Sequence, residues 1–352
     1  MLAGLIKVAL GDRHSMILRQ DGSVWSAGTA VHCGVRSFGI VNHFVQVIAS
    51  GATAIAAGSG YSMVIKQDHS VWAVGSNNQG QLGDGTRSHK RRLGFVKVIP
   101  GAMAITAGKH HSMVLTQQGS VWVTGWNKFG QLGDSSLTLY RTTFWQVISG
   151  GAIAVAAGSI HSIVLKDDGS VWAAGRNING QLGDGSKTDR STFVQAMISG
   201  GVSIAAGGSH SMVLKQDGSV WTTGLNKVGQ LGDGSSKSRN TYTPSVWSGV
   251  KALAACNQHS LILKQDGSVW AAGSNIYGQL GDGTTTNSTA FVQVIFDGAI
   301  AVAAGGFHSM VVNYDGSIWA TGWNEYGQLG DDSTASSNAF MRLAPFYGRN
   351  TI

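Results

Sequence analysis

Glutamate, proline and cysteine are all scarce in this 352-residue chain. Glu325 is the only glutamate among its 18 acidic residues, whereas helical proteins normally use glutamate freely. The three prolines suit a chain of strands, because proline cannot donate a ladder hydrogen bond. The 51 glycines suit tight turns that need a positive φ. The composition therefore predicts an all-β protein.

Several classes of protein are excluded by what else is missing. The two cysteines, Cys33 and Cys256, lie far apart and signal neither a disulfide framework nor a zinc site. The sequence has no run of apolar residues long enough to span a membrane. Residues 1–10 are apolar but include Lys7 and lack a cleavage pattern, so they read as a first strand and not as a signal peptide. A cytoplasmic or nuclear location is favoured, and no cofactor or metal is expected.

One sequence unit recurs seven times, roughly every 50 residues. A tryptophan follows Ser-Val or Ser-Ile in each unit, at Trp25, Trp72, Trp122, Trp172, Trp221, Trp270 and Trp319. His-Ser precedes it at His14, His111, His161, His210, His259 and His308, with Tyr61 in the second unit. The segment N-x-x-G-Q-L-G-D follows it from Asn77, Asn127, Asn177, Asn226, Asn275 and Asn324, and the first unit has lost this segment. This regularity is typical of a repeat architecture.

Each unit contains four strand patterns, which around the fifth tryptophan are residues 193–198, 202–207, 210–215 and 219–223. Asp217-Gly218 between the last two is a strong hairpin signal, because a type I′ turn needs positive φ at both central residues. We expect the N-x-x-G-Q-L-G-D segment to carry the chain to the next sheet. Residues 1–352 are therefore predicted to form one closed seven-bladed β-propeller with four-stranded antiparallel blades.

The two ends of the chain suggest how the ring closes. The N-terminus begins at the second type of strand, and the C-terminus ends on a strand of the first type, Phe340 to Leu343. We expect this C-terminal strand to pair with residues 5–10 and to complete the first blade, which would leave no exposed sheet edge. The sequence repeats cover approximately residues 4–50, 51–100, 101–150, 151–199, 200–248, 249–297 and 298–346.

The composite sequence of the repeated unit is G-x-x-H-S-M-V-L-K-Q-D-G-S-V-W-A-A-G-x-N-x-x-G-Q-L-G-D-G. This unit resembles the repeat of the regulator of chromosome condensation family, and the resemblance covers essentially the whole chain. The resemblance implies a seven-bladed propeller in which sequence repeat and blade are offset. Members of that family include a nucleotide-exchange factor for the GTPase Ran, a plant UV-B photoreceptor, ubiquitin-ligase modules and a bacterial β-lactamase inhibitor. The resemblance therefore implies the fold and leaves the function open. The extra tryptophans of the photoreceptor are missing here, which argues against photoreception.

The residues that recur in every unit are interpreted as structural. Equivalent histidines on neighbouring blades would lie roughly 10 Å apart, too far to share a zinc ion, so we expect each His to hydrogen bond to the next blade. The strand tryptophans should pack between blades. The recurring aspartates, Asp84, Asp134, Asp184, Asp233, Asp282 and Asp331, lack the spacing of a calcium loop and should cap turns.

Binding residues are expected where the units differ. The two residues before each His vary, and they should lie in turns at one end of the ring. They are Asp12-Arg13, Ser59-Gly60, Lys109-His110, Ser159-Ile160, Gly208-Ser209, Asn257-Gln258 and Gly306-Phe307. We predict that a partner binds there through Arg13, Lys109, His110, Ile160 and Phe307, with Phe307 as the main apolar anchor.

A second candidate surface lies beside the N-x-x-G-Q-L-G-D segments. It comprises Trp126 and Trp323 together with the basic run Arg87, Lys90, Arg91 and Arg92 in the second long connection. The aromatic residues could equally cover their own blade, and the basic run could be a solvated loop. If functional, the run would bind an acidic protein or the phosphates of a nucleic acid.

No nucleophile, base and orienting group stand out from the repeated background, so the sequence does not indicate an enzyme. The net charge of +7 permits an acidic partner. The sequence favours a non-enzymatic protein-interaction module or scaffold, either a monomeric ring or a subunit of a larger complex. The alternative is a guanine-nucleotide exchange factor for a small GTPase, which the family resemblance implies. Repeats of this length leave little room for a protruding wedge hairpin, which argues against the alternative.

Overall fold

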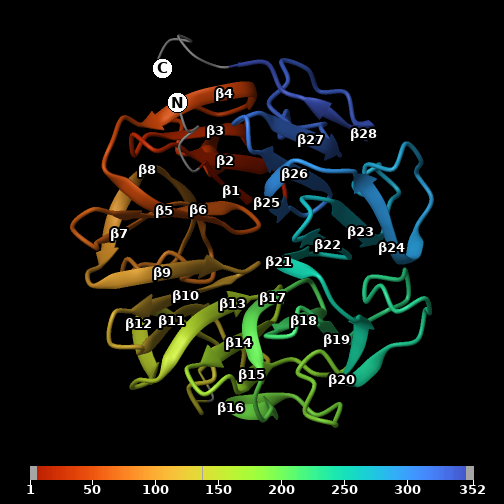
Figure 1. The fold of residues 1–352 in the computed structure, drawn as a ribbon. Helices are drawn as coiled ribbons and strands as arrows, with labels where there is room; N and C mark the ends of the chain where they lie inside the picture. Colours follow the sequence, from red (N-terminus) through yellow and green to blue (C-terminus); the bar gives the residue numbers. More distant parts are fainter. Residues whose placement is uncertain (1–5, 137, 346–352) are drawn as a thin grey trace.

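The computed structural model describes residues 6–136 and 138–345 as a ring of seven sheets around a central axis (Figure 1). Each sheet, or blade, has four antiparallel strands, and the first strand of each lies nearest the axis. The described residues contain a single short helix, α1 (Ala30–Cys33). The predicted all-β, seven-bladed propeller is confirmed.

The strands follow the chain blade by blade. Blade 1 contains β1 (Lys7–Leu10), β2 (His14–Leu18), β3 (Val24–Thr29) and β4 (Ile40–Ile48). Blade 2 contains β5 (Ala52–Ala57), β6 (Tyr61–Lys66), β7 (Val71–Asn77) and β8 (Ser88–Ile99). Blade 3 contains β9 (Ala102–Ala107), β10 (His111–Thr116), β11 (Val121–Trp126) and β12 (Tyr140–Ile148). Blade 4 contains β13 (Ala152–Ala157), β14 (His161–Lys166), β15 (Val171–Gly175) and β16 (Arg190–Met197).

The remaining three blades repeat this pattern. Blade 5 contains β17 (Gly201–Ala206), β18 (His210–Lys215), β19 (Val220–Gly224) and β20 (Arg239–Val246). Blade 6 contains β21 (Val250–Cys256), β22 (His259–Lys264), β23 (Val269–Gly273) and β24 (Ser288–Ile295). Blade 7 contains β25 (Ala299–Ala304), β26 (His308–Asn313), β27 (Ile318–Gly322) and β28 (Ser337–Arg342).

The predicted closure by a C-terminal strand is wrong. Among the described residues, strand β28 pairs with β27 of its own blade, and β1 pairs with β2 alone. The long connection through N-x-x-G-Q-L-G-D joins the third and fourth strands of one blade, whereas the short link after the fourth strand leads to the next blade. The chain therefore finishes each blade before it starts the next, and the predicted offset between repeat and blade is also wrong.

The ring closes instead through contacts between blades 7 and 1. Ser15 Oγ lies 2.8 Å from His308 Nε2 and donates a hydrogen bond to the carbonyl oxygen of Gln328 at 2.6 Å. One buried apolar cluster spans this boundary, with Leu10, Ile17 and Phe44 from one side and Met310 and Leu329 from the other. The boundary is thus a packed interface and not a shared sheet.

The histidines join the blades in a repeating hydrogen-bond belt, as predicted. Nε2 of each bonds to the Ser Oγ of the following blade at 2.8–2.9 Å, in the pairs His14–Ser62, His111–Ser162, His161–Ser211, His210–Ser260, His259–Ser309 and His308–Ser15. Each of these serines donates its own proton to a carbonyl oxygen of the preceding blade, as Ser211 does to Gln181. The hydroxyl has only one proton, so Nε2 must carry the proton that it donates. Burial lowers the pKa of these rings well below 7, so they are neutral at that pH.

The strand tryptophans and loop aspartates also have structural roles, as expected. Trp270 of blade 6 packs against an apolar cluster that includes Met212 of blade 5, and its Nε1 donates to Ser268. The carboxylate of Asp233 accepts hydrogen bonds from Asn226 Nδ2 and from the backbone N–H of Ser235, and it pairs with Arg239. The described residues contain no group of three or more His, Cys, Asp or Glu side chains placed to hold a metal ion.

Candidate functional site

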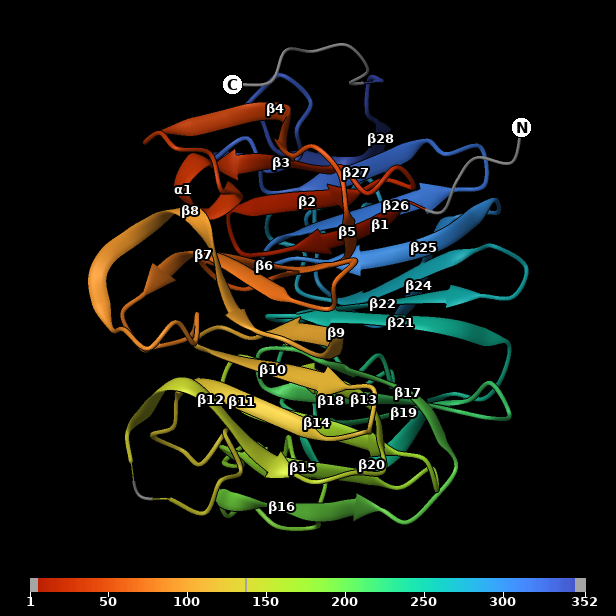
Figure 2. The same ribbon diagram turned by 90° about the vertical axis from the view of Figure 1, so that its left-hand side faces the viewer.

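The variable residues gather at one end of the ring, which we call the loop end. It is formed by the turns between the first and second strands of the blades, by the long connections, and by α1 (Figure 2). The antiparallel strand order places both kinds of segment at the same end. The opposite end, which we call the link end, carries the Asp-Gly hairpin turns and the links between blades.

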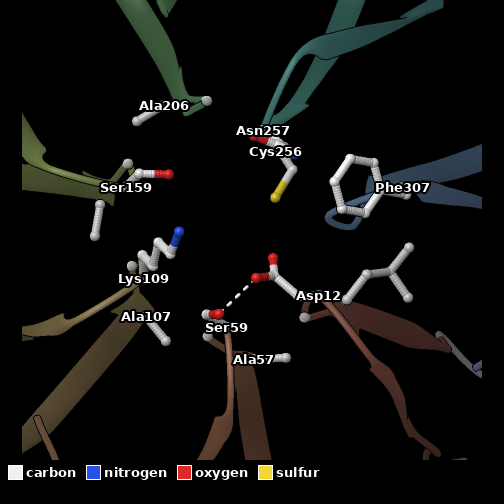
Figure 3. Close-up of a pocket in the computed structure, with 17 residues that line it drawn as sticks. Asp12, Ala57, Ser59, Ala107, Lys109, Ser159, Ala206, Cys256, Asn257 and Phe307 are labelled. Carbon is white, nitrogen blue, oxygen red and sulfur yellow. Dashed lines mark hydrogen bonds between the residues drawn. The ribbon is translucent and has the colours of Figure 1, made fainter. Parts of the chain in front are cut away.

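The centre of the loop end is a pocket at the mouth of the ring axis (Figure 3). The side chains of Asp12, Lys109, Cys256 and Phe307 converge on it from four different blades. The carboxylate of Asp12 accepts a hydrogen bond from Ser59 Oγ, and burial raises its pKa. Burial also raises the pKa of the Cys256 thiol to about 12, so this cysteine is not a reactive thiolate.

Phe307 belongs to an aromatic cluster that joins both predicted surfaces. Its ring lies 5.3 Å from that of Tyr277 and 5.6 Å from that of Trp323, measured between centroids. Trp323 in turn contacts Tyr326, and the guanidinium of Arg13 lies 4.5 Å above the Tyr326 ring. These five residues, which we call the aromatic cluster, come from blades 6, 7 and 1. Edge-to-face rings and a stacked guanidinium hold one another in place, so the cluster is pre-organised.

A second aromatic group lies on blade 3. The His110 ring is 5.5 Å from Trp126, and Trp126 is 5.4 Å from Phe129. Arg176 of blade 4 lies over the Phe129 ring at 4.4 Å. His110 and Trp126, predicted on separate surfaces, are therefore direct neighbours.

The remaining predicted residues differ in their surroundings. Ile160 is half-buried, and its backbone carbonyl oxygen accepts a hydrogen bond from Arg176 N–H. Most of the basic run lies on strand β8 and not in a loop as expected. Arg92 pairs with Asp84 at 2.8 Å, and Arg87 stacks on Tyr140 at 4.0 Å, so both have structural partners. Lys90 and Arg91 are exposed.

Blade 1 differs from the other six because α1 replaces the lost N-x-x-G-Q-L-G-D segment. In the other belt pairs the serine donates to the backbone carbonyl oxygen of the Gln in N-x-x-G-Q-L-G-D, as Ser211 does to Gln181. In blade 1 the carbonyl oxygen of His32 in α1 replaces it and accepts a hydrogen bond from Ser62 Oγ at 2.6 Å. The His32 side chain is 4% exposed, and neither ring nitrogen has a hydrogen-bond partner among the described residues. Burial, followed by the positive charges of Arg91 and Arg13, lowers its pKa to about 4.

The sequence analysis overlooked the apolar side chains at the link end. Ile198, Trp247 and Phe296 occupy equivalent positions just after the fourth strands of blades 4, 5 and 6, and Tyr314 lies in a nearby hairpin turn. These four side chains are 73% to 83% exposed. The signal was present in the sequence, because the same position in blades 1 to 3 carries Ala49, Pro100 and Ser149.

Comparison with known families identifies the class of protein. A family model described as "Regulator of chromosome condensation (RCC1) repeat" matches seven segments that together cover more than half of the chain: residues 5–31, 52–81, 104–131, 152–181, 202–230, 250–279 and 299–328. A second model of the same description matches residues 68–115, 168–214 and 266–312. The chain therefore belongs to the RCC1 repeat family. A search of the curated proteins by sequence finds no match.

Solved structures with the same fold share little sequence identity with this chain. Human WBSCR16 has a TM-score of 0.81 at 22% identity, with 95% of each chain covered. Prp20p from Saccharomyces cerevisiae, whose structure was reported with its binding properties to Gsp1p and histones, has a TM-score of 0.80 at 18% identity. That match covers 99% of this chain and 88% of Prp20p. Identities this low establish the fold alone.

Proposed function

We propose that this chain is a non-enzymatic protein-interaction module whose partner binds the loop end of the propeller. The observation that carries the proposal is the aromatic cluster, in which Phe307, Trp323 and Arg13 from two predicted surfaces form one pre-organised patch. Aromatic and arginine side chains of this kind dominate the binding energy of protein interfaces. Structures of Prp20 with Kap60, and its binding to Gsp1p and histones, give further support, since that related propeller binds other proteins.

The distribution of charge favours an acidic partner. Lys109 lines the central pocket, and Lys128, Arg176 and Lys227 lie in the long connections of blades 3, 4 and 5 at the same loop end. The long connections at the loop end also carry aspartates, but Asp84, Asp134, Asp184 and Asp233 each pair with an arginine. The carboxylates of the Asp-Gly hairpin turns, including Asp217 and Asp266, lie at the link end. An acidic partner would be steered toward the loop end, so its association rate should fall as salt increases.

Two phenylalanines at opposite ends of the ring provide a matched test of the binding surface. With the partner captured and identified, Phe307→Ala should weaken binding by at least about fivefold, because truncation of a central aromatic anchor costs more than about 1 kcal/mol. Phe296→Ala at the link end should leave the affinity unchanged. Affinities are measured by surface plasmon resonance, and melting curves confirm that both variants fold. Loss of binding in Phe296→Ala alone would place the interface at the link end.

Nucleotide exchange on a small GTPase is the second candidate function, supported by the family to which the chain belongs. Asp12, the only acid among the variable turn residues, points into the central pocket and bonds to Ser59. Its carboxylate is thus occupied by Ser59 within the protein, which favours the interaction role without exchange. The purified chain can be added to a GTPase loaded with a fluorescent nucleotide. Accelerated release that Phe307→Ala abolishes would establish exchange as the function.

A further inference from the structure

We propose that a pocket between α1 and the turns of blades 1 to 3 binds a dianionic phosphoryl group. Arg13 from blade 1, Arg91 from β8 of blade 2 and Lys109 from blade 3 all line this pocket. Three cations from three blades thus line one hollow, although the Arg13 guanidinium also lies over the Tyr326 ring. Two arginines and a lysine offer the donors that a phosphate needs. We call this the basic pocket.

Arg91 differs from the four arginines on fourth strands that lie beside the loop aspartates. Arg92, Arg141, Arg190 and Arg239 each pair with the aspartate of their own long connection. Among the described residues, the side chains of Arg91 and Lys109 form no ion pair with a loop aspartate, and Asp12 is the carboxylate on which the charges of Lys109 and Arg13 act. The structure therefore neutralises the arginines beside the loop aspartates but leaves a positive charge on the basic pocket.

The pKa of His32 is sensitive to that positive charge. Its ring forms part of the pocket wall, 5.6 Å from the His14 ring, and its two nitrogens have no partner among the described residues. After burial, Arg91 and Arg13 are the groups that lower its pKa. An uncompensated positive potential acts on the ring, and a bound anion would reduce that potential.

The charge count distinguishes a phosphoryl group from a carboxylate. Arg13, Arg91 and Lys109 contribute three positive charges, and Asp12 is the one carboxylate among the lining residues. A phosphate dianion matches the remaining charge, whereas one carboxylate would leave part of it unbalanced. Asn78 and Gln81 also line the pocket and offer neutral amide donors to further phosphate oxygens.

Inorganic phosphate tests this proposal without any protein partner, so its failure can be separated from failure of the proposed function. Isothermal titration calorimetry at constant ionic strength should detect phosphate binding to the full chain. Arg91→Ala should weaken it by about tenfold or more, since a hydrogen bond to a charged group contributes about 1.5–3 kcal/mol. Arg87→Ala is the matched control, because Arg87 lies nearby but stacks on Tyr140. Its affinity for phosphate should stay within twofold of the native value.

Two further measurements decide the specificity of the basic pocket. Acetate at the same ionic strength should bind much more weakly than phosphate, as the charge count requires. Phosphate should also raise the pKa of His32 in NMR titrations, with Asp12, His14, Lys109 and His110 as the other titratable groups around the pocket. Equal phosphate affinity in Arg91→Ala and Arg87→Ala, or equal binding of acetate and phosphate, would overturn the proposal. Binding of a phosphorylated peptide but not of free phosphate would also overturn it.

Discussion

Lowering the pH from 7 toward 5 is expected to unfold this protein in one steep transition. The histidines of the hydrogen-bond belt are fully buried, and burial is the main cause of their low pKa values. These values are about 3 for His111, His210 and His308 and about 4 for His161 and His259. An unfolded histidine titrates near 6.5. The stabilisation is therefore complete above pH 6.5 and is lost as the pH falls toward the folded values.

The expected effect is large because the belt repeats the same group around the ring. At pH 5 each of the six belt histidines is almost fully protonated when unfolded and mostly neutral when folded, so about five to six protons are taken up on unfolding. This corresponds to a slope of about 7 kcal/mol per pH unit, comparable with the whole stability of a typical domain. Urea unfolding followed by fluorescence between pH 7.5 and 5 measures the slope.

Single substitutions separate the belt histidines from the rest of the titration. His210→Gln removes one buried titrating ring and should lower the slope by about one proton, even if it destabilises the protein. Ser149→Ala is the control, because Ser149 lies in an exposed link and carries no group that titrates in this range, so the slope should stay unchanged. If the pH dependence of the free energy of unfolding corresponds to one proton or less in the native chain, the belt histidines do not stay neutral in the folded state.

Ser15→Ala is expected to destabilise the protein by about 2–5 kcal/mol, because it leaves two buried polar groups without partners. Those groups are Nε2 of His308 and the carbonyl oxygen of Gln328, both of blade 7. Ser211 makes the same two bonds between blades 4 and 5, with His161 and Gln181. The two substitutions should therefore cost the same.

This comparison tests whether the ring is closed in solution. If blades 7 and 1 separate, Ser15→Ala will cost little while Ser211→Ala remains costly. Chemical denaturation gives both free energies of unfolding, and Ser149→Ala in an exposed link serves as the control for a neutral change. A cost for Ser15→Ala well below that for Ser211→Ala would contradict the closed ring.

The sequence could not reveal which residues meet at the loop end. Phe307, Tyr277 and Trp323 belong to different turns and connections. Only the curvature of the propeller brings their aromatic side chains into contact. The same holds for Arg13, Arg91 and Lys109, which three separate blades carry to one pocket. Sequence reasoning selected most of these residues because they vary between repeats, but it assigned them to separate surfaces.

The sequence by itself determined the number of blades, the identity of their strands and the structural role of the recurring histidines, because these depend on local patterns repeated at a fixed period. It did not determine how the strands are grouped into blades. The same order of strands along the chain is compatible with a long connection between two blades or with a long connection inside one blade. The tertiary structure decided this, because the long connection is needed to pack against the next blade. Leu82 in one such connection is buried beside Phe144 of the following blade. The backbone of Asp84 forms an isolated antiparallel β-bridge with that of Thr143 in the same blade as Phe144. The segment joins two adjacent strands, so its length is explained by its packing against the next blade and not by the separation of those strands.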